Sequence, residues 1–353
     1  MDEFALRPDD DRFAFISEAA ARRDVAPIII EKDFWVCWTL RRLLSIPGMA
    51  DTLTFKGGTS LSKAYGIIER FSEDIDLTIS RTAPSLAETL SPMDEGISGK
   101  ERMRRTKALK AASQSYVGDV VLPSLRDAIA TALGTQDGWD IALDPDDQDA
   151  QTILFEYPVV RAFRGFFAER LFNPEVFDTG PYGYIKPRIK LEFGARGETE
   201  PSEKKAIVPY IAQAFPTEFS KAEVEVQTLS VARTFWEKVT ILHALYHGTK
   251  LLPEMSRHYY DTAMLAKKGV DAIALAAPEL LARVVLNKSL MFADNKASYE
   301  TAVLGSLHLV PHADLRERLR ADYAAMGEMF MAAPPSFDEL IDMIAALEMR
   351  LNA

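Results

Sequence analysis

The sequence contains KGGTSLSK at residues 56–63 and FSEDIDLTI at residues 71–79. The apolar run at residues 53–55, just before the first stretch, is typical of a short buried strand. Glycine adopts positive φ angles at little steric cost, so Gly57-Gly58 predicts the sharp turn that ends this strand. We expect a helix to begin directly after the turn and a second strand to follow at 71–79.

The start of that helix is a candidate phosphate-binding site. Thr59 or Ser60 is expected to cap the first turn, where free backbone N–H groups and the helix dipole favour an anion. Lys63, one turn further on, adds a positive charge. The alternative is that Gly57-Gly58 forms only a tight turn.

The second stretch predicts a strand with two different faces. A period of two places Ile75 and Leu77 on the face that enters the core, and Asp74 and Asp76 on the open face. Two carboxylates at this spacing suit Mg²⁺, which takes its other ligands from water and substrate phosphates. A phosphate-binding turn followed by these carboxylates indicates metal-assisted nucleotidyl transfer. Two surface aspartates on an edge strand are the simpler alternative.

KGGTSLSK at residues 56–63 and RFSEDIDL at residues 70–77 resemble motifs of the AbiEii/AbiGii family of nucleotidyltransferase toxins, within the DNA polymerase β-like superfamily. The resemblance extends to IEKDFWV at residues 30–36, to WEK at 236–238 and to RHYYD at 257–261, and it spans roughly residues 25–270. It implies an α+β fold, in which a polymerase β-like nucleotidyltransferase core with a small mixed sheet is joined to a helical N-terminal segment and a C-terminal helical lobe.

The resemblance also implies a set of site residues. Glu192, on a strand expected at 182–193, is the candidate third carboxylate, because alternation places it with Lys190 on the face opposite Leu191. An amphipathic edge strand with Lys190 and Glu192 in water is the alternative. Metal ligands are expected at Asp74, Asp76 and Glu192. Nucleotide contacts are expected at Lys56, Gly57, Gly58, Thr59, Ser60, Lys63 and Lys190.

Two further site residues follow from the downstream motifs. In the resembling toxins a lysine at the place of Lys238 faces the nucleotide phosphates, whereas its position alone also suits a lysine that lies along an apolar helix flank. Asp261 is expected to orient Lys238 or the attacking group; without the resemblance, Arg257 and Asp261 would form a surface ion pair. His258 stands where the family often has an acidic residue, so its role is open. The expected catalytic residues are Asp74, Asp76, Glu192, Lys238 and Asp261.

The activity that the resemblance implies is transfer of a nucleoside monophosphate from an NTP to an acceptor, with Mg²⁺ or Mn²⁺ bound and pyrophosphate released. The resemblance to toxins of toxin–antitoxin and phage-defence systems favours the 3′ end of tRNA as the acceptor and a cognate antitoxin as a partner. Nucleotidylation of a protein or a small molecule is one alternative. A non-catalytic module that binds a nucleotide is another.

Composition limits the partners and the location. The 353 residues carry a formal net charge of −11, which argues against tight binding of nucleic acid over the whole surface. No apolar run approaches the ~20 residues of a membrane span, and the acidic N-terminus lacks the basic region of a signal peptide, so we expect a cytoplasmic protein. Cys37, the single cysteine, lies in an apolar helical pattern and is expected to be a buried thiol, not a nucleophile.

Three further groupings of charged or titratable residues have more than one interpretation. Six Lys and Arg residues at 100–110 form either a solvated helix face or a docking surface for an RNA backbone. Six aspartates at 137–149 indicate an exposed loop, with a metal site as the alternative. His243 and His247 have the i,i+4 spacing of a zinc pair, but they lack a companion Glu or Cys, so two helix-surface histidines are expected.

The apolar patterns divide the chain into two expected domains, residues 1–228 and 229–353. The first is expected to contain helices at about 12–24 and 27–45, a helical insertion near 92–133, and strands near 151–157 and 182–193. In the second domain, apolar residues at helical spacing, interrupted by Pro334-Pro335, predict a helical lobe.

Overall fold

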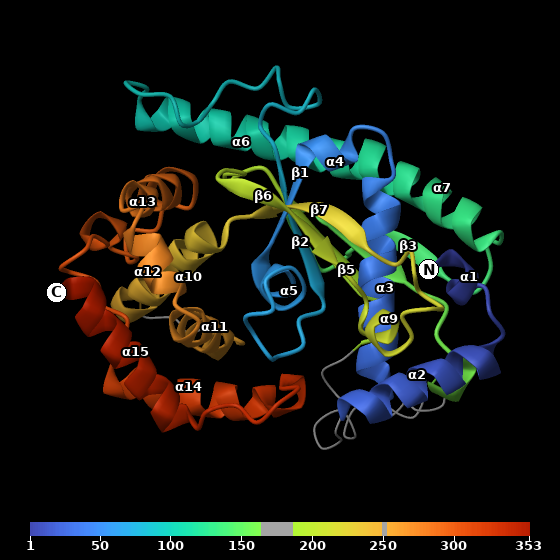
Figure 1. The fold of residues 1–353 in the computed structure, drawn as a ribbon. Helices are drawn as coiled ribbons and strands as arrows, with labels where there is room; N and C mark the ends of the chain where they lie inside the picture. The colour runs from blue at the N-terminus through green and yellow to red at the C-terminus, as the bar shows by residue number, and fades with distance from the viewer. Residues whose placement is uncertain (164–185, 249–252) are drawn as a thin grey trace.

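The computed structural model describes residues 1–163, 186–248 and 253–353 (Figure 1). In these parts of the chain the strands are β1 (Leu53–Lys56), β2 (Asp74–Ile79), β3 (Asp140–Leu143), β4 (Thr152–Glu156), β5 (Ile189–Gly194), β6 (Ser202–Ile207) and β7 (Val224–Leu229). The N-terminal helices are α1 (Asp2–Ala5), α2 (Asp9–Arg23), α3 (Pro27–Leu44), α4 (Met49–Thr52), α5 (Gly57–Lys63), α6 (Gly99–Ser115), the π-helix η1 (Tyr116–Val121), α7 (Leu122–Leu133) and α9 (Tyr210–Ala214). The C-terminal helices are α10 (Val231–His247), α11 (Ser256–Lys267), α12 (Val270–Leu275), α13 (Glu279–Met291), η3 (Tyr299–Thr301), α14 (Ala313–Ala325), η4 (Met326–Met329) and α15 (Phe337–Asn352).

The strands form one mixed sheet in the order β3-β4-β5-β2-β1-β7-β6. The pairs β2–β5 and β1–β7 are parallel, and the other neighbouring pairs are antiparallel. Because β1 and β2 are neighbours in the middle of the order, the two sequence motifs lie side by side with further strands on both flanks. The predicted α+β class is confirmed, and the sheet has seven strands among the described residues, more than the small sheet expected.

Alternation along the central strands has the predicted effect. Ile75, Leu77 and Ile79 of β2 are at most 1% exposed, and β5 buries Ile189 and Leu191 in the same way. Successive side chains of a strand point to opposite faces, so the remaining face of both strands carries polar residues. The charged residues of the motifs therefore share one face of the sheet.

Helix α3 covers the apolar face of the sheet and contacts β2, β5 and β7. Its aromatic residues are fully buried, and the ring of Trp35 stacks on that of Tyr157 with centroids 5.5 Å apart. Cys37 on the same helix is buried, as predicted, and burial raises the pKa of its thiol to about 12. A thiol that stays protonated at neutral pH is not a nucleophile.

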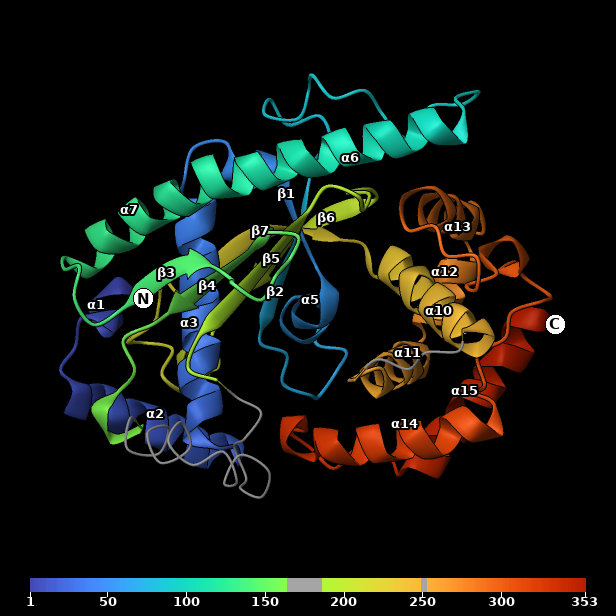
Figure 2. The ribbon, with the colours of Figure 1, turned by 180° about the vertical axis from the view of Figure 1, so that it is seen from behind.

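The predicted helical insertion is confirmed over residues 99–133. Ser98 caps α6 by accepting a hydrogen bond from the backbone N–H of Glu101 at 3.2 Å. The π-helical turn η1 joins α6 to α7, and the three segments run as one long rod across the molecule in both views (Figures 1 and 2). Helix α7 contacts α3 and β3, so this rod is packed against the sheet domain.

The C-terminal helices lie together at one side of the sheet, and the two chain ends lie at opposite ends of the molecule (Figures 1 and 2). Their apolar side chains form a second hydrophobic cluster, separate from the one around the sheet. The predicted helical lobe is therefore confirmed. Leu61 and Ile68 from the N-terminal part also belong to this second cluster. A domain boundary between residues 228 and 229 stays a prediction.

Three strands lie outside the sequence expectations. Strand β6 is an edge strand that buries only Ile207, so its sequence carries no clear alternation. Strand β7 alternates the buried Val224 and Val226 with exposed residues and pairs with β6. The expectation of an exposed loop at 137–149 was wrong for β3, because Ile141 is fully buried where this strand pairs with β4. Residues 182–185, the start of one predicted strand, lie outside the described residues.

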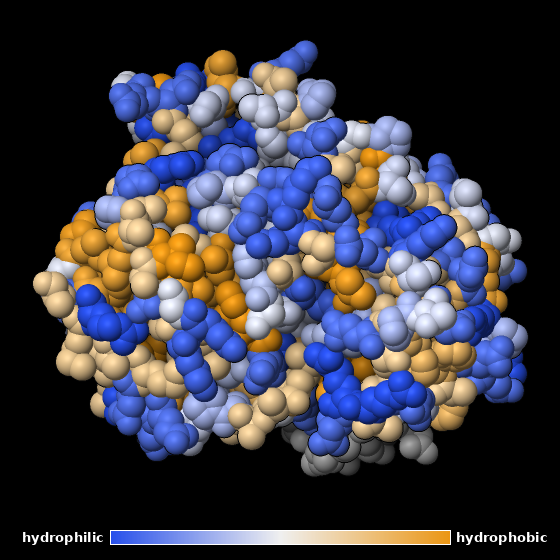
Figure 3. Space-filling model, in the orientation of Figure 1, coloured by the Kyte–Doolittle hydropathy of each residue, from blue (hydrophilic) through white to orange (hydrophobic). Residues whose placement is uncertain are grey.

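The space-filling view shows hydrophobic residues gathered over the C-terminal helices (Figure 3). Exposed large apolar side chains in this lobe include Ile273, Leu286, Val303 and Leu304. Across the described part of the chain, every helix is too short or too polar to cross a lipid bilayer.

Candidate active site

The double glycine is required because the turn lies directly against β2. Gly57 has a φ of +77°, and a Cβ atom built on it would lie 1.9 Å from Oδ2 of Asp76. A Cβ atom on Gly58 would lie 2.6 Å from Oγ of Ser72 and 2.7 Å from Nη2 of Arg70. Any larger residue would displace a side chain of the second motif, so the glycines hold the two motifs in contact.

Two residues expected to cap the helix and bind nucleotide are instead used inside the fold. Oγ1 of Thr59 donates to the backbone oxygen of Asp74 at 2.5 Å, and Oγ of Ser60 donates to the backbone oxygen of Gly57 at 2.8 Å. Both side chains are fully buried. The predicted cap was wrong, because α5 already begins at Gly57, with Lys56 as the preceding residue and no side-chain cap. Thr59 holds the strand that carries Asp74 in place.

Lys63 was also expected to contact the nucleotide, and the structure places it elsewhere. Its Nζ lies 2.7 Å from Oδ1 of the buried Asp33 on α3 and 3.6 Å from the ring centroid of Tyr210. Lys63 and Tyr210 line a separate cavity between α5 and α9. The contact with Asp33 explains why a lysine at this place is buried: the carboxylate compensates its charge.

The upstream motif at residues 30–36 also supports the site from α3. Lys32 donates to Oε2 of Glu73 at 2.7 Å, and its side chain is only 2% exposed. The neighbouring Glu31 accepts a hydrogen bond from the backbone N–H of Val160 at 2.8 Å. These buried charges connect α3 to the segment before β2 and to the segment after β4, so the motif has a positioning role in the structure.

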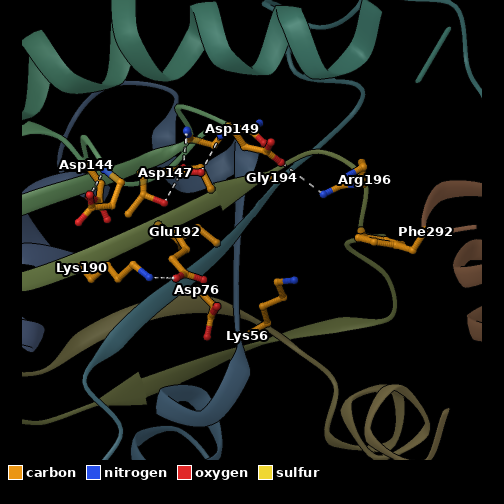
Figure 4. A pocket seen from close by; sticks show the side chains of 16 residues that line it. Lys56, Asp76, Asp144, Asp147, Asp149, Lys190, Glu192, Gly194, Arg196 and Phe292 are labelled. Atoms are coloured by element: carbon orange, nitrogen blue, oxygen red, sulfur yellow. Dashed lines mark hydrogen bonds and ion pairs between the residues drawn. The ribbon is translucent and has the colours of Figure 1, made fainter. Parts of the chain in front are cut away.

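Strand register brings the candidate carboxylates together. Asp76 lies opposite Lys56 of β1 on one side and opposite Glu192 of β5 on the other, and Asp74 lies opposite Lys190. Lys190 forms an ion pair with Glu192 on the same strand. Figure 4 shows Asp76, Glu192 and Lys56 facing one cavity. Glu192 is thus next to Asp76, as the third-carboxylate hypothesis requires.

The pKa values of the two aspartates are shifted toward the neutral form. Desolvation by burial, followed by repulsion from Glu73, Asp76 and Glu192, raises the pKa of Asp74 to about 7. Desolvation also raises the pKa of Asp76 to about 6, although Lys56 opposes the shift. A bound cation would favour the ionised form of both groups.

The cavity has a narrow part of about 190 Å³ and a wide part of about 500 Å³, and Lys56, Asp76 and Glu192 line both. The narrow part is also lined by Gly57, Gly58, Arg70, Ser72, Asp74, Thr234, Glu237, Lys238, Ile241, Arg257, His258 and Lys288. The wide part is also lined by Asp144, Asp146, Asp147, Asp149, Lys190, Arg196 and Phe292, among others (Figure 4).

Lys238 lies on the wall of the narrow part, in contact with a buried charge network. Its Nζ is 2.6 Å from Oδ2 of Asp261, whose side chain is fully buried. Arg70 donates to both carboxylate oxygens of Asp261, at 2.7 and 2.8 Å. Despite its burial, Asp261 has a pKa held well below its usual value by Arg70 and Lys238. Asp261 therefore positions Lys238 from behind, and the predicted alternative of a surface pair with Arg257 was wrong.

His258, whose role the sequence left open, lines the narrow part beside Lys238. Its Nδ1 is 3.3 Å from Nζ of Lys238. Desolvation, reinforced by the charges of Lys238 and Arg257, lowers the pKa of His258 well below its usual value. The lowered pKa favours the neutral ring, which can form a hydrogen bond with Nζ of Lys238 through Nδ1.

The histidine pair on α10 is not a zinc pair. Nε2 of His243 contacts the backbone oxygen of Ser298 at 3.2 Å and Oγ1 of Thr301 at 3.0 Å, and Nδ1 accepts from the backbone N–H of His308 at 3.1 Å. Both ring nitrogens of His243 are used, and the residue is fully buried, so the expectation of a helix-surface histidine was wrong for it. Residue His247 is partly buried beside it.

The acidic and basic segments meet at the rim of the wide part. Lys110 of α6 forms an ion pair with Asp149, and Arg105 contacts both Glu101 and Asp94. Several cations of the 100–110 cluster are therefore paired locally. The aspartates at 144–149 that line the cavity were not expected at the site, because only the folding of β3 and β4 brings this loop next to β5.

Other cavity residues had little sequence signal. Arg70 is the first residue of the second family motif, which could have suggested a role at the site, and its side chain forms a buried ion pair with Asp261. Lys288 and Phe292 come from the end of α13 in the C-terminal lobe, more than two hundred residues after the double glycine. Only tertiary structure brings them to the cavity.

Comparison with known proteins shows to which family the chain belongs. The sequence model of the family described as nucleotidyl transferase AbiEii toxin, type IV TA system, matches residues 38–343. No curated protein matches the sequence. Among solved structures, MenT4, a nucleotidyltransferase toxin from Mycobacterium tuberculosis H37Rv, is similar over 99% of this chain and 96% of that chain, with 14% sequence identity and a TM-score of 0.35. Because the family match covers most of the sequence, the chain belongs to the AbiEii family of nucleotidyltransferase toxins of type IV toxin–antitoxin systems.

Proposed function

We propose that this nucleotidyltransferase toxin transfers a nucleoside monophosphate from an NTP to the 3′ end of tRNA, with Mg²⁺ or Mn²⁺ bound and pyrophosphate released. The observation that carries the proposal is the pairing of β1, β2 and β5, which gathers Asp74, Asp76, Glu192 and Lys56 at one cavity. Family membership supplies the type of enzyme and the toxin class. The metal, the acceptor and the roles of individual residues belong to the proposal.

The donor set fits a hard divalent cation. Asp74, Asp76 and Glu192 offer carboxylate oxygens, and desolvation by burial raises the pKa values of both aspartates, so a bound cation would stabilise their ionised forms. Among the described residues no three His, Cys, Asp or Glu side chains are already arranged as a metal site, so water and substrate phosphates would complete the coordination. Mg²⁺ bound there supplies neutralisation of phosphate charge and orients the α-phosphate for in-line attack.

The protein's own residues hold the nucleotide and orient the acceptor. Gly57 and Gly58 let the backbone approach a phosphate closely, and Lys56 and Lys238 present ammonium groups to the same cavity. Glu192 would hold a second metal or would accept the proton of the acceptor hydroxyl. Catalysis of this kind depends mainly on positioning and electrostatic stabilisation.

One observation favours a second candidate acceptor. Four aspartates, Asp144, Asp146, Asp147 and Asp149, line the wide part of the cavity. Their charge disfavours a polyanionic RNA backbone at that place and favours a protein or small-molecule acceptor. For tRNA, the basic cluster on α6 offers a separate surface beside this rim, where Lys107 is exposed. Only the 3′ end would then enter the cavity.

The test is to incubate the purified protein with Mg²⁺, total tRNA and each α-³²P-labelled NTP in turn. Label on tRNA with the wild-type protein and none with Asp76→Asn is the expected result. Asp137→Asn, at an exposed aspartate outside the cavity, is the matched control and should label tRNA as the wild type does. Label on a protein band or on a small molecule would replace tRNA by the second candidate. An absence of label on any acceptor would contradict the proposal.

Toxicity is tested separately in growing cells. We expect expression of the wild-type chain to arrest growth, expression of Asp76→Asn to leave growth normal, and co-expression of the cognate antitoxin to restore it. Growth arrest by Asp76→Asn at equal protein level would show that toxicity does not require the carboxylate site.

A further inference from the structure

The last turn of α13 forms part of the cavity from the C-terminal lobe. Lys288 lines the narrow part, and Phe292, which follows the helix, lines the wide part. Figure 4 shows Phe292 on a segment separate from the sheet strands that carry Asp76 and Glu192. The cavity is therefore closed by two parts of the chain, the sheet and the C-terminal lobe.

Helix α13 is held in this position by polar contacts with the segment after β5. Nδ2 of Asn287, next to Lys288, donates to the backbone oxygen of Arg196 at 3.1 Å. Arg283, one turn earlier, lies 3.2 Å from Oε2 of Glu198, and the buried Arg233 of α10 contacts the same carboxylate at 2.7 Å. These contacts fix the helix next to the strand that carries Glu192. Lys288 is thus held at the cavity before any ligand binds.

The ammonium group of Lys288 lacks an anionic partner in the described part of the protein. Its Nζ lies 4.9 Å from the ring centroid of Phe292. The carboxylate that acts most strongly on it, Glu237, is already engaged by Arg233 at 3.2 Å. Desolvation, reinforced by the charges of Lys56, Arg233 and Lys238, lowers the pKa of Lys288. An unpaired cation in a desolvated position is unfavourable unless an anion binds there.

Other lysines near the cavity show how a buried ammonium group is compensated by a carboxylate. Lys63 and Lys238 are both buried, and each has an aspartate within 2.7 Å, Asp33 and Asp261 respectively. Within the described residues Lys56, at the end of β1, has no ion-pair partner, and it lines both parts of the cavity. The two lysines without a carboxylate partner, Lys56 and Lys288, face the narrow cavity beside Gly57-Gly58.

We propose that Lys288 binds the polyphosphate chain of the nucleoside triphosphate, so that the end of α13 forms the C-terminal wall of the nucleotide site, with Lys56 contributing from the sheet. A polyphosphate supplies the negative charge that both ammonium groups lack, and the glycine turn gives it room beside the carboxylates. The inference rests on the proposed function in one respect, because it requires that the nucleotide binds in this cavity.

The test measures binding, without any acceptor. Inorganic tripolyphosphate, each NTP and the matching nucleoside monophosphates are titrated calorimetrically, with Mg²⁺, into the wild type, Lys288→Ala and Lys288→Arg. We expect Lys288→Ala to weaken binding of tripolyphosphate and NTP by about tenfold or more, to leave monophosphate binding within about twofold, and Lys288→Arg to retain most of the affinity. Lys268→Ala, at an exposed lysine of the same lobe, is the control and should bind like the wild type.

Two results would overturn the inference. One is NTP affinity of Lys288→Ala within about twofold of the wild type, and the other is an equal loss for monophosphate and triphosphate, which would indicate a structural role. Because Lys288 has no carboxylate partner among the described residues, its replacement should not lower the melting temperature, and Lys288→Met provides a second variant of similar length if Ala unfolds the protein. Tripolyphosphate binding that depends on Lys288, without label transfer to any acceptor, would refute the proposed transferase reaction and leave this inference intact.

Discussion

Two aspartates beside the same cavity wall differ in how their charge is compensated. Asp261 is fully buried, yet Arg70 and Lys238 hold its pKa well below the usual value. Desolvation raises the pKa of Asp76 to about 6, and Glu192 lies beside it. The comparison separates a carboxylate whose charge two cations compensate from one that is held in a desolvated position beside a second carboxylate.

The difference has a physical origin in the number of partners. Asp261 receives two hydrogen bonds from Arg70 and an ion pair from Lys238, which together satisfy its charge. Asp76 lies between a lysine and a second carboxylate on neighbouring strands. A protein retains such an unfavourable arrangement where function requires it, so uncompensated charge marks the candidate site more reliably than burial does.

The largest expected effect is on activity, from Asp76→Asn. We expect the transfer rate to fall by about 10³-fold or more, since electrostatic stabilisation of the reacting phosphates depends on this carboxylate. The melting temperature at neutral pH should stay the same or rise, because the ionised form of Asp76 is disfavoured in the fold. Label-transfer kinetics and thermal unfolding measure both quantities. A large loss of stability in Asp76→Asn would contradict the difference that we infer between Asp76 and Asp261.

Asp261→Asn should act mainly on stability. The substitution leaves Arg70 and Lys238 buried without a full counter-charge, which is expected to lower the free energy of unfolding by about 4 kcal/mol. Asp338→Asn is the matched control, because Asp338 forms an exposed ion pair with Arg320, and its replacement should change the free energy of unfolding far less. Urea denaturation compares the variants. Equal effects of both substitutions would contradict a structural role for the buried network.

Gly57→Ala should lower stability by an intermediate amount and should lower activity severely. The positive φ alone is expected to cost about 1 kcal/mol, and contact of the new Cβ with Asp76 adds about 2 kcal/mol while displacing that carboxylate. Gly66→Ala separates the two causes, since Gly66 has a φ of +61° and open space around it. If both variants lost equal stability and Gly57→Ala kept its activity, the close approach to Asp76 would have no functional importance.

The smallest expected effect is a dependence of stability on pH. The pKa values of Asp74 and Asp76 are raised from a usual 3.8 to about 7 and about 6, respectively. Between the usual value and the raised value of each aspartate, the folded state therefore binds more protons than the unfolded state. Their contribution to the stability of the metal-free protein should increase as the pH falls from about 8 to about 5. Mg²⁺ should accordingly raise the melting temperature more at about pH 8 than at about pH 5.5.

Asp74→Asn supplies the control for the pH effect. We expect this variant to show a smaller change of stability with pH than the wild type, and a smaller response to Mg²⁺. Differential scanning fluorimetry at several pH values measures the difference between the two proteins, which cancels the contributions of other titrating groups. A Mg²⁺ response that is independent of pH would place the metal away from these aspartates.

Alternation and local chemistry predicted much of the carboxylate site. Period two placed Asp74 and Asp76 on one face of a strand and Glu192 on the polar face of another, and the structure has both strands adjacent. The same local reasoning failed for Lys63. A lysine one turn after a glycine turn looks free to bind phosphate, but α3 presents Asp33 to it from a distant part of the sequence. Partners that are far apart in the chain leave no periodic signal.

The sequence by itself determined the α+β class, the two motifs, the aspartate pair and the C-terminal helices, because strand and helix periodicity and glycine geometry are local properties. Tertiary structure alone decided which charges are compensated. It places two cations next to Asp261, leaves Lys288 without a carboxylate partner among the residues that the structure describes, and brings α13 and the loop at 144–149 to the cavity. The reason is that compensation of charge depends on distance in space, and strand pairing and helix packing set that distance independently of separation along the chain.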